Sequence, residues 1–490
     1  FTLSISAEYE DGPITLNYQD ELQFAMDVTL NQAGFPLKTA EIRSSPLLID
    51  LDNDGDKEII FGDYNGIIHV LNNDGTEFNS TTFPFDTGDA IWGSPAAADL
   101  DRDGNIDFAV SSKSKHLYIF DMNGLKTDYE TEVYLIGTPA IGNLDDDPEL
   151  EVVFSGYSRN NKIFAINYDG TNVEGFPFKL FEYEYFETEP DILDSTLVSE
   201  IVKAGVELAD FNNNGRDDIV IGTDGNHIYL ILDDGSIAPG FPFTAEDKFQ
   251  TAPSILDVDG EKFIAAGNNN DTLYVINSDG SLHFSVDTGG KVNTSPVFLE
   301  TGGIIYLAFG SKNDEIYLVD MNGNALPGWP VMINGNIEGS VICSDLDGDG
   351  EVEIAANTDS GKMFVFHLDC SLFHHFPISV NIPFTGPPII ADMDLDGDLE
   401  IFGGTGKSLT VIDIKVSGNN NNYWNMYRMN PRRNGLYTAD SDLAVNSFNQ
   451  FPKTFKISPA YPNPFNPIIN IHYENPQISI VKVDVYDLRG

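Results

Sequence analysis

The chain has 490 residues, of which 77 are Asp or Glu and 26 are Lys or Arg, so its formal net charge is −51. This excess of negative charge excludes nucleic acid as a default partner, because phosphate groups would be repelled. The hydrophobic content of 41% and the aromatic content of 11% exclude a disordered acidic chain, because they suffice for a sizeable core.

Residues 1–33 precede the first repeat of the chain and alternate in polarity at 16–18 and 22–24. We expect an N-terminal strand segment here, which in one interpretation is the tail of a preceding domain. The chain begins at Phe1 without a signal peptide and ends at Gly490 directly after an expected strand. Both ends therefore indicate a processed or excised piece.

From residue 34 to residue 440 the chain repeats one unit: an apolar strand, an acidic loop, a second strand, a turn, a third strand and a hairpin. Most loops begin 44 to 49 residues after the previous one (50 to 99, 99 to 143, 210 to 257, 345 to 392). Four short strands at this period are typical of a β-propeller blade. Seven loop starts and a loopless copy around Ser295 predict an all-β propeller of eight blades, with seven as the alternative.

The fourth, outer strand of several units carries a Phe-Pro or Trp-Pro pair, as in Gly175-Phe176-Pro177 and Gly328-Trp329-Pro330. Proline suits an edge strand, where one side makes no ladder hydrogen bonds. An extra Gly34-Phe35-Pro36 lies before the first unit, so we expect it to close the ring against the last blade.

Six loops carry acidic or amide side chains at positions 1, 3, 5 and 9. Alternate oxygens on a tight loop converge on one point, which suits Ca²⁺ with its six to eight oxygen ligands, and the backbone carbonyl of position 7 adds another. The side chains are Asp50, Asp52, Asp54 and Glu58; Asp99, Asp101, Asp103 and Asp107; Asn143, Asp145, Asp147 and Glu151; Asp210, Asn212, Asn214 and Asp218; Asp345, Asp347, Asp349 and Glu353; and Asp392, Asp394, Asp396 and Glu400. Position 7 is held by Asp56, Asn105, Glu351 and Asp398 in the four fully acidic loops.

The loops differ from an EF-hand, which needs a glutamate at position 12 and flanking helices. Solvated turns are the plain alternative, but six copies of one pattern favour calcium, with four to six ions per chain. The third loop has Pro148 where glycine is expected, and the fourth has only two carboxylates. The turn that starts at Asp257 is too short to bind an ion.

The pattern Asp-x-Asp-x-Asp-Gly-x-x-Asp/Glu, followed by pairs such as Phe61-Gly62 and Phe402-Gly403, resembles the FG-GAP (integrin-α-like, VCBS-type) propeller repeats over about residues 34 to 440. The resemblance implies a calcium-stabilised propeller used for adhesion or ligand binding. Similar repeats also occur in eight-bladed rhamnogalacturonan lyases and as accessory parts of secreted hydrolases.

After a linker at 441–454, residues 455–490 no longer follow the pattern of the repeats. The segment Tyr-Pro-Asn-Pro-Phe-Asn-Pro at 461–467 and the Val-Tyr-Asp at 485–487 resemble FlgD-like Ig folds and the sorting domains of bacterial type IX secretion substrates. The resemblance implies an incomplete domain of this kind. It also implies a protein exported to the cell surface or the medium.

In a four-stranded meander the turns between strands one and two and between strands three and four share one face. The acidic loops are therefore expected on one face, and a ligand site on the opposite one. The 67 residues from Asn143 to Asp210 exceed the usual spacing. The surplus, at 180–190, predicts either a binding loop with aromatic rings or an extension of an outer strand.

Three functions stay open. The favoured one is a secreted or cell-surface, non-catalytic adhesion or ligand-binding module, monomeric as a fragment, whose partner is an extracellular protein or carbohydrate. The others are a polysaccharide lyase of the rhamnogalacturonan type and the accessory region of a secreted hydrolase or protease. No catalytic residue is assigned, and no apolar run approaches the roughly 18 residues of a membrane span. A disulfide between Cys343 and Cys370 and two free thiols are both open.

Overall fold

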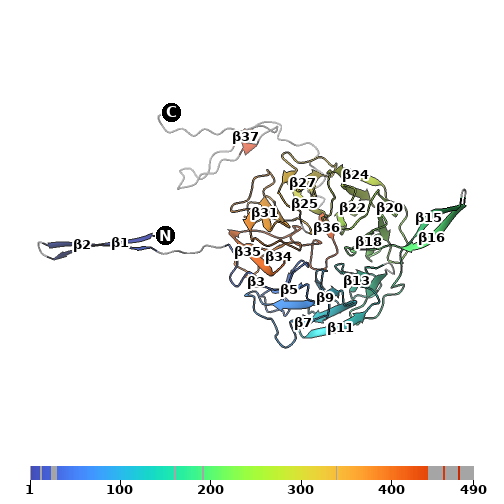
Figure 1. The fold of residues 1–490 in the computed structure, drawn as a ribbon, viewed down its shortest axis with the longest axis horizontal. Helices are drawn as coiled ribbons and strands as arrows, with labels where there is room; N and C mark the ends of the chain where they lie inside the picture. Colours follow the sequence, from blue (N-terminus) through green and yellow to red (C-terminus); the bar gives the residue numbers. More distant parts are fainter. Residues whose placement is uncertain are drawn as a thin grey trace.

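The computed structural model describes residues 2–11, 14–23, 30–158, 162–189, 192–337, 339–439, 456–457 and 473–474. In these residues the protein is all-β, and its strands form a ring of eight blades (Figure 1). The predicted eight-bladed propeller is confirmed. In the part of the chain that the structure describes, no helix is long and apolar enough to cross a membrane.

The first four blades follow the chain from the inner to the outer strand. Blade 1 contains β4 (Leu47–Ile49), β5 (Glu58–Gly62), β6 (Ile67–Leu71) and β7 (Phe85–Asp86). Blade 2 contains β8 (Ala96–Ala98), β9 (Asp107–Ser112), β10 (His116–Asp121) and β11 (Gly124–Glu130). Blade 3 contains β12 (Ala140–Gly142), β13 (Glu151–Ser155) and β14 (Ile163–Ile166), with Phe178 bridged to Ile163 at the outer edge. Blade 4 contains β17 (Glu207–Ala209), β18 (Asp218–Gly222), β19 (His227–Ile231) and β20 (Phe243–Thr244).

The second half of the ring repeats this order. Blade 5 contains β21 (Ser254–Val258), β22 (Glu261–Gly267), β23 (Thr272–Asn277) and β24 (Leu282–Asp287). Blade 6 contains β25 (Val297–Thr301), β26 (Ile304–Ser311), β27 (Glu315–Asp320) and β28 (Val331–Met332). Blade 7 contains β29 (Ile342–Ser344), β30 (Glu353–Asn357), β31 (Lys362–Phe366) and β32 (Ile378–Ser379). Blade 8 contains β33 (Ile389–Ala391), β34 (Asp398–Gly404) and β35 (Ser408–Ser417).

Blade 8 obtains its outer strand from the start of the ring. The strand β3 (Leu37–Lys38) pairs antiparallel with β35, with Leu37 opposite Leu409. This pairing confirms that the segment with Gly34-Phe35-Pro36 closes the ring. Contacts with β35 already begin at Leu30, whose carbonyl accepts a hydrogen bond from the Asp413 N–H at 2.8 Å. Residues 30–33 therefore join the last blade as well.

The core lies between neighbouring blades. The second strand of a blade packs on both faces, which is why it is an apolar run and not an alternating pattern. In β5, for example, Ile59, Ile60 and Phe61 are all fully buried. One apolar cluster spans blades 8, 1 and 2 and another spans blades 5, 6 and 7, so the packing continues around the ring.

The chain from Trp424 to Ala439 fills the axis of the propeller, which sequence reasoning did not foresee. Its carbonyls accept hydrogen bonds from the innermost strands of six blades, at distances of 2.8–3.0 Å. The segment ends in β36 (Leu436–Ala439), which pairs parallel with β21 and lies at the centre of the ring (Figure 1). A free strand edge needs partners for its N–H groups. Residues 424–439, here called the channel segment, supply these partners.

Arg433 lies at the centre of the channel segment and is fully buried. It donates hydrogen bonds to the carbonyls of Pro95 at 3.0 Å, Pro46 at 2.8 Å and Tyr427 at 2.5 Å. Arg428, also buried, pairs with Glu207 of β17 at 2.8 Å. The two arginines thus connect blades 1, 2 and 4 through the axis.

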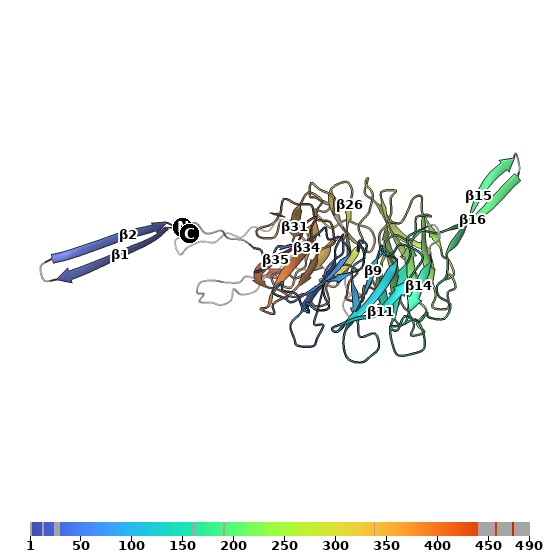
Figure 2. The same cartoon turned by 60° about the horizontal axis from the view of Figure 1, so that its bottom comes forward.

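The surplus residues between blades 3 and 4 form a separate hairpin of β15 (Phe181–Glu189) and β16 (Ile192–Ser199), which reaches beyond the blades (Figure 2). It is not an extension of an outer strand. A second hairpin pairs β1 (Thr2–Asp11) with β2 (Ile14–Gln23), and β37 (Lys456–Ile457) pairs with β38 (Tyr473–Glu474). The expected linker and the rest of the expected sorting domain lie outside the described residues. Cys343 and Cys370 are both free thiols.

Candidate metal centres

Five of the predicted loops bring carboxylates together at the turn between the first and second strands of a blade. In each, the ligand-type oxygens lie within 4.8 Å of one another. The groups are Asp50, Asp52 and Glu58; Asp99, Asp101 and Asp107; Asp145, Asp147 and Glu151; Asp345, Asp347 and Glu353; and Asp394, Asp396, Asp398 and Glu400. Such acidic clusters are able to bind a metal ion.

The loops hold their own carboxylates in place through backbone hydrogen bonds. The acid at position 1 accepts from the N–H of the glycine at position 6, as between Asp50 and Gly55 at 3.1 Å. Gly55 has φ of 100°, a conformation that favours glycine. The acid at position 9 accepts from the N–H of position 2, as between Glu58 and Leu51 at 2.8 Å. Glu58 uses only Oε2 in this way, whereas Asp50 also accepts with Oδ1, from the Asp54 N–H at 3.1 Å.

The remaining oxygens are the test of whether a cation fits. Several are buried and lack a hydrogen-bond partner, which is costly for an acidic oxygen. They include Asp99 Oδ1, Glu151 Oε1, Asp345 Oδ1, Asp347 Oδ1, Asp392 Oδ1, Asp398 Oδ1 and Glu400 Oε1. Hard carboxylate oxygens that converge in this way fit Ca²⁺. In the Asp345 cluster a ring nitrogen of the protein also faces the site, since His367 Nδ1 lies 3.0 Å from Glu353 Oε1.

The position-9 acids have strongly raised pKa values. Burial raises the pKa of Glu58 to about 7 and that of Glu400 to about 8, and the neighbouring aspartates add to the shift. Burial raises the pKa of Glu151 to about 8 and that of Glu353 to about 7 for the same reason. A buried negative charge next to like charges is unfavourable. A bound cation would reverse this, because it favours the ionised form.

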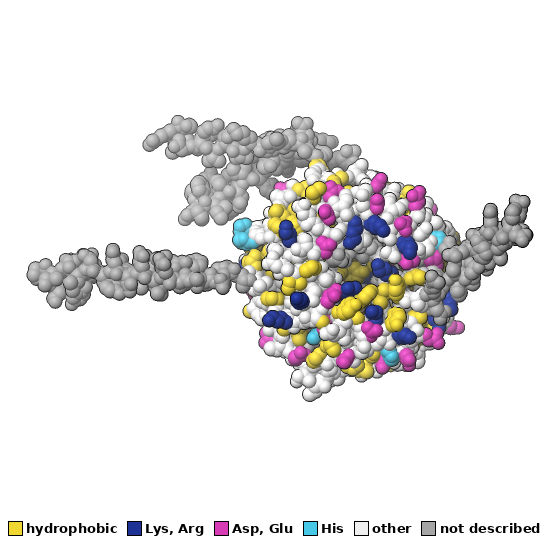
Figure 3. Space-filling model, viewed as in Figure 1, with side chains coloured by type: hydrophobic (Ala, Val, Ile, Leu, Met, Phe, Trp, Pro, Cys, Tyr) yellow, Lys and Arg dark blue, Asp and Glu magenta, His cyan; other side chains and the backbone are white. Residues whose placement is uncertain are grey.

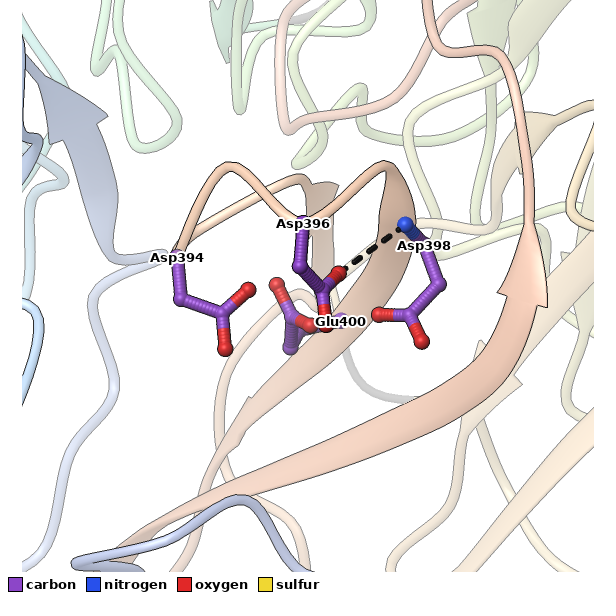
Figure 4. Close-up of side chains that lie close together, drawn as sticks. All are labelled: Asp394, Asp396, Asp398 and Glu400. Carbon is purple, nitrogen blue, oxygen red and sulfur yellow. Dashed lines mark hydrogen bonds between the residues drawn. The ribbon is translucent and has the colours of Figure 1, made fainter.

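The acidic loop of blade 8, which begins at Asp392 and is called the eighth loop below, gathers the most carboxylates, four in one cluster (Figure 4). The Asp398 N–H donates to Asp396 at 3.1 Å. The Gln32 amide donates to Asp394 at 2.7 Å, and the Lys57 ammonium of the first loop donates to the Asp392 carbonyl at 2.9 Å. The eighth loop therefore lies where the ring closes, and it contacts both the segment before blade 1, through Gln32, and the first loop, through Lys57.

Some predicted ligands lie at the exposed tips of the loops and outside the clusters. Asp54 Oδ1 accepts from the Asp56 N–H, Asp103 Oδ1 from the Asn105 N–H, and Asp349 Oδ1 from the Glu351 N–H, at 2.7–2.9 Å. These bonds form the tight turn at positions 5 to 7.

The second loop contains a cation of the protein itself. The Lys126 ammonium, from β11, lies 3.0 Å from a carboxylate oxygen of Asp101 and 3.0 Å from one of Asp107. Sequence reasoning missed this contact, because Lys126 belongs to the outer strand of the blade. A lysine also neutralises the short turn of blade 5. Lys262, which is buried, pairs with Asp257 at 3.0 Å.

The fourth loop is held together by amides and a guanidinium. Asn212 and Asn214 both donate to Asp233 Oδ1, at 3.3 and 3.0 Å, and Arg216 pairs with Asp233 at 2.6 Å. Asp218 accepts from the N–H groups of Phe211 and Asp233. Asp210 accepts from Gly215 at 2.8 Å. The predicted residues thus come together, but protein donors face their oxygens.

The FG-GAP-like repeat family matches residues 50–110, which contain the first two acidic loops. Among solved structures, the V. cholerae biofilm matrix protein Bap1 is similar with a TM-score of 0.56 at 14% identity, covering 83% of this chain and 96% of that one. Sqt1 of Saccharomyces cerevisiae is similar with a TM-score of 0.52 at 11% identity, covering 78% and 98%. None of the curated proteins matches the chain. At these identities the likeness shows the fold alone.

Proposed function

We propose that this chain is a calcium-stabilised propeller that acts outside the cell as a non-catalytic binding module. The observation that carries the proposal is the convergence of carboxylates in the loops, several of whose oxygens are buried and unpaired. Lys126 meets the second loop and amides meet the fourth, so the loops that begin at Asp50, Asn143, Asp345 and Asp392 are the ones that would hold Ca²⁺. Position 9 and the acids at positions 1 and 3 would supply most ligands.

The loops support a structural role for the ion. Each joins the two innermost strands of a blade, and its position-9 acid is the first or third residue of the second strand. An ion there would hold the loop and both strands together, since metal ligation adds stability where the unfolded chain has no such site. A chain without a disulfide between its two cysteines would gain most from such ions.

A location outside the cell agrees with weak, modular calcium sites, which fill at the millimolar calcium found there. The acidic loops and the similarity of residues 50–110 to FG-GAP-like repeats support this location, and the fold likeness to a biofilm matrix protein is in keeping with it. Export by type IX secretion remains part of the proposal, based on the resemblance of residues 455–490 to sorting domains.

A chelator experiment tests the calcium part. We expect EDTA to lower the unfolding temperature of the purified chain and added Ca²⁺ to restore it, with Mg²⁺ a poor substitute because it demands rigid octahedral geometry. An unfolding temperature that EDTA leaves unchanged would overturn the proposal.

A further inference from the structure

The face of the propeller opposite the acidic loops has a hollow on the propeller axis. The connections that enter the innermost strands of all eight blades line it, and its volume is about 220 Å³. Tyr427 of the channel segment contributes to the lining, so the segment closes the hollow toward the axis. Figure 3 looks onto this face and shows Lys and Arg side chains around a central depression.

The lining is cationic although the whole chain is strongly acidic. Among the described residues it contains Arg43 and Lys203 and no carboxylate. The Arg43 guanidinium lies 4.6 Å from the Trp92 ring and 5.1 Å from the Tyr64 ring, and the Lys113 ammonium lies 4.8 Å from the Trp92 ring. Cation–π contacts of this kind fix the direction of the charged groups. The Trp92 and Tyr64 rings therefore hold the charged groups of Arg43 and Lys113 at the rim of the hollow.

The polar groups around the hollow have unused hydrogen-bonding capacity. Arg43 uses its Nε for Glu41, at 2.7 Å, and among the described residues its two terminal amino groups have no partner. Trp92 Nε1 and Thr251 Oγ1 are buried and unpaired, and Thr251 is 91% buried. Buried donors without a partner are rare in proteins, so a ligand that satisfies them would bind favourably.

We propose that this axial hollow binds an acidic saccharide, with the carboxylate on Arg43 and Lys203 and sugar hydroxyls on Trp92 Nε1, Thr251 and Asn293. A guanidinium matches a carboxylate in two parallel hydrogen bonds. Uncharged donors beside it match hydroxyl groups, which a phosphate or a glutamate side chain lacks. Because the hollow is smaller than the roughly 300 Å³ at which pockets for drug-sized ligands begin, one sugar residue fills it.

The net charge of −51 does not prevent this binding. At physiological salt, charges more than about 8 Å apart are largely screened, and the acidic loops lie on the other face. The inference names a ligand for the binding role proposed above and rests on that role. It does not depend on bound calcium.

Binding is measured by isothermal titration calorimetry with a hyaluronan tetrasaccharide, which carries glucuronate, and with the same tetrasaccharide after reduction of its carboxyl groups. Triglutamate serves as the peptide probe. The variants are Arg43→Gln, the exposed Lys203→Gln and, as a matched control, Lys312→Gln. Lys312 is an exposed lysine in the turn between β26 and β27 on the same face, outside the hollow.

We expect one tetrasaccharide per chain and about tenfold weaker binding, which is about 1.4 kcal/mol, for the reduced sugar and for each of Arg43→Gln and Lys203→Gln. Lys312→Gln binds like the wild type. Equal affinity of the reduced sugar or of both hollow variants would overturn the inference, as would no binding at all. Equal or tighter binding of triglutamate would assign the hollow to acidic peptides. In each case an effect of EDTA on the unfolding temperature would leave the proposed calcium role standing.

Discussion

Replacing Lys126 with methionine tests whether a protein cation excludes calcium from the second loop. The Lys126 ammonium contacts Asp101 and Asp107, both at 3.0 Å. Among the described residues no lysine or arginine pairs with the other four clusters, although His367 lies 3.0 Å from Glu353 and the Gln32 amide lies 2.7 Å from Asp394. Methionine is unbranched like lysine and one atom shorter, and it removes the charge. The substitution is therefore expected to act in opposite directions with and without calcium.

Without calcium the substitution destabilises the protein. The Asp107 side chain is 1% exposed and that of Lys126 is 22% exposed, so the pair lies between an exposed one, worth about 0–1 kcal/mol, and a buried one, whose disruption costs about 3–5 kcal/mol. We expect a loss of about 2 kcal/mol in the free energy of unfolding. With calcium, the vacated loop binds an ion. At a Ca²⁺ concentration of 100 times the dissociation constant this adds about 2.7 kcal/mol, which offsets the loss.

The assay is urea unfolding of both proteins in EDTA and in 10 mM Ca²⁺ (roughly 100 times a dissociation constant of about 10⁻⁴ M), together with a count of bound ions. Lys262→Met is the matched control, because Lys262 pairs with Asp257 in a turn too short for an ion. It loses stability equally in both solutions. If Lys126→Met were as destabilised in calcium as in EDTA, and bound no additional ion, the reasoning about this loop would be refuted.

Two further perturbations follow from buried groups. Arg433→Met leaves three carbonyls without their donor. At about 1–3 kcal/mol each, urea unfolding should show a loss of about 3–9 kcal/mol, and a loss below about 1 kcal/mol would contradict a structural role for the channel segment. In EDTA, the raised pKa values of Glu58, Glu151 and Glu400, about 7 to 8, mean that the folded state binds protons more tightly than the unfolded one. The unfolding temperature should then be highest near pH 5 and fall as the pH rises to about 8, and saturating Ca²⁺ should remove this fall; a rise with pH in EDTA would contradict the assignment.

The blades and the loops were predictable from the sequence because both are local. A period of strands and turns specifies a blade, and alternate acids on one turn meet whatever surrounds them. The ring closure was predictable for the same reason, since Phe35-Pro36 repeats the mark of the other outer strands. The blades and the loops need only residues within one repeat, and the closure of the ring needs only the recurrence of one short motif.

The channel segment was not predictable, because it depends on contacts between distant elements. Lys126 was not predictable either, because its contact depends on where the outer strand of its own blade places the side chain. Residues 424–435 are rich in Asn and Arg and lack alternation, so they read as a solvated loop. Their partners are inner strand edges of six blades, which sequence does not bring together. Three arginines at 428, 432 and 433 in so acidic a chain were the available signal. Lys126 is 19 residues from Asp107, and only the geometry of β11 places it in the loop.

The calcium content of the purified chain tests the central claim most directly. After dialysis against 2 mM Ca²⁺, elemental analysis should find about four ions per chain, one for each acidic cluster that lacks a lysine. Glu400→Gln should lower this count by one. Less than one calcium ion per chain under these conditions would contradict the account of this protein as a calcium-stabilised propeller.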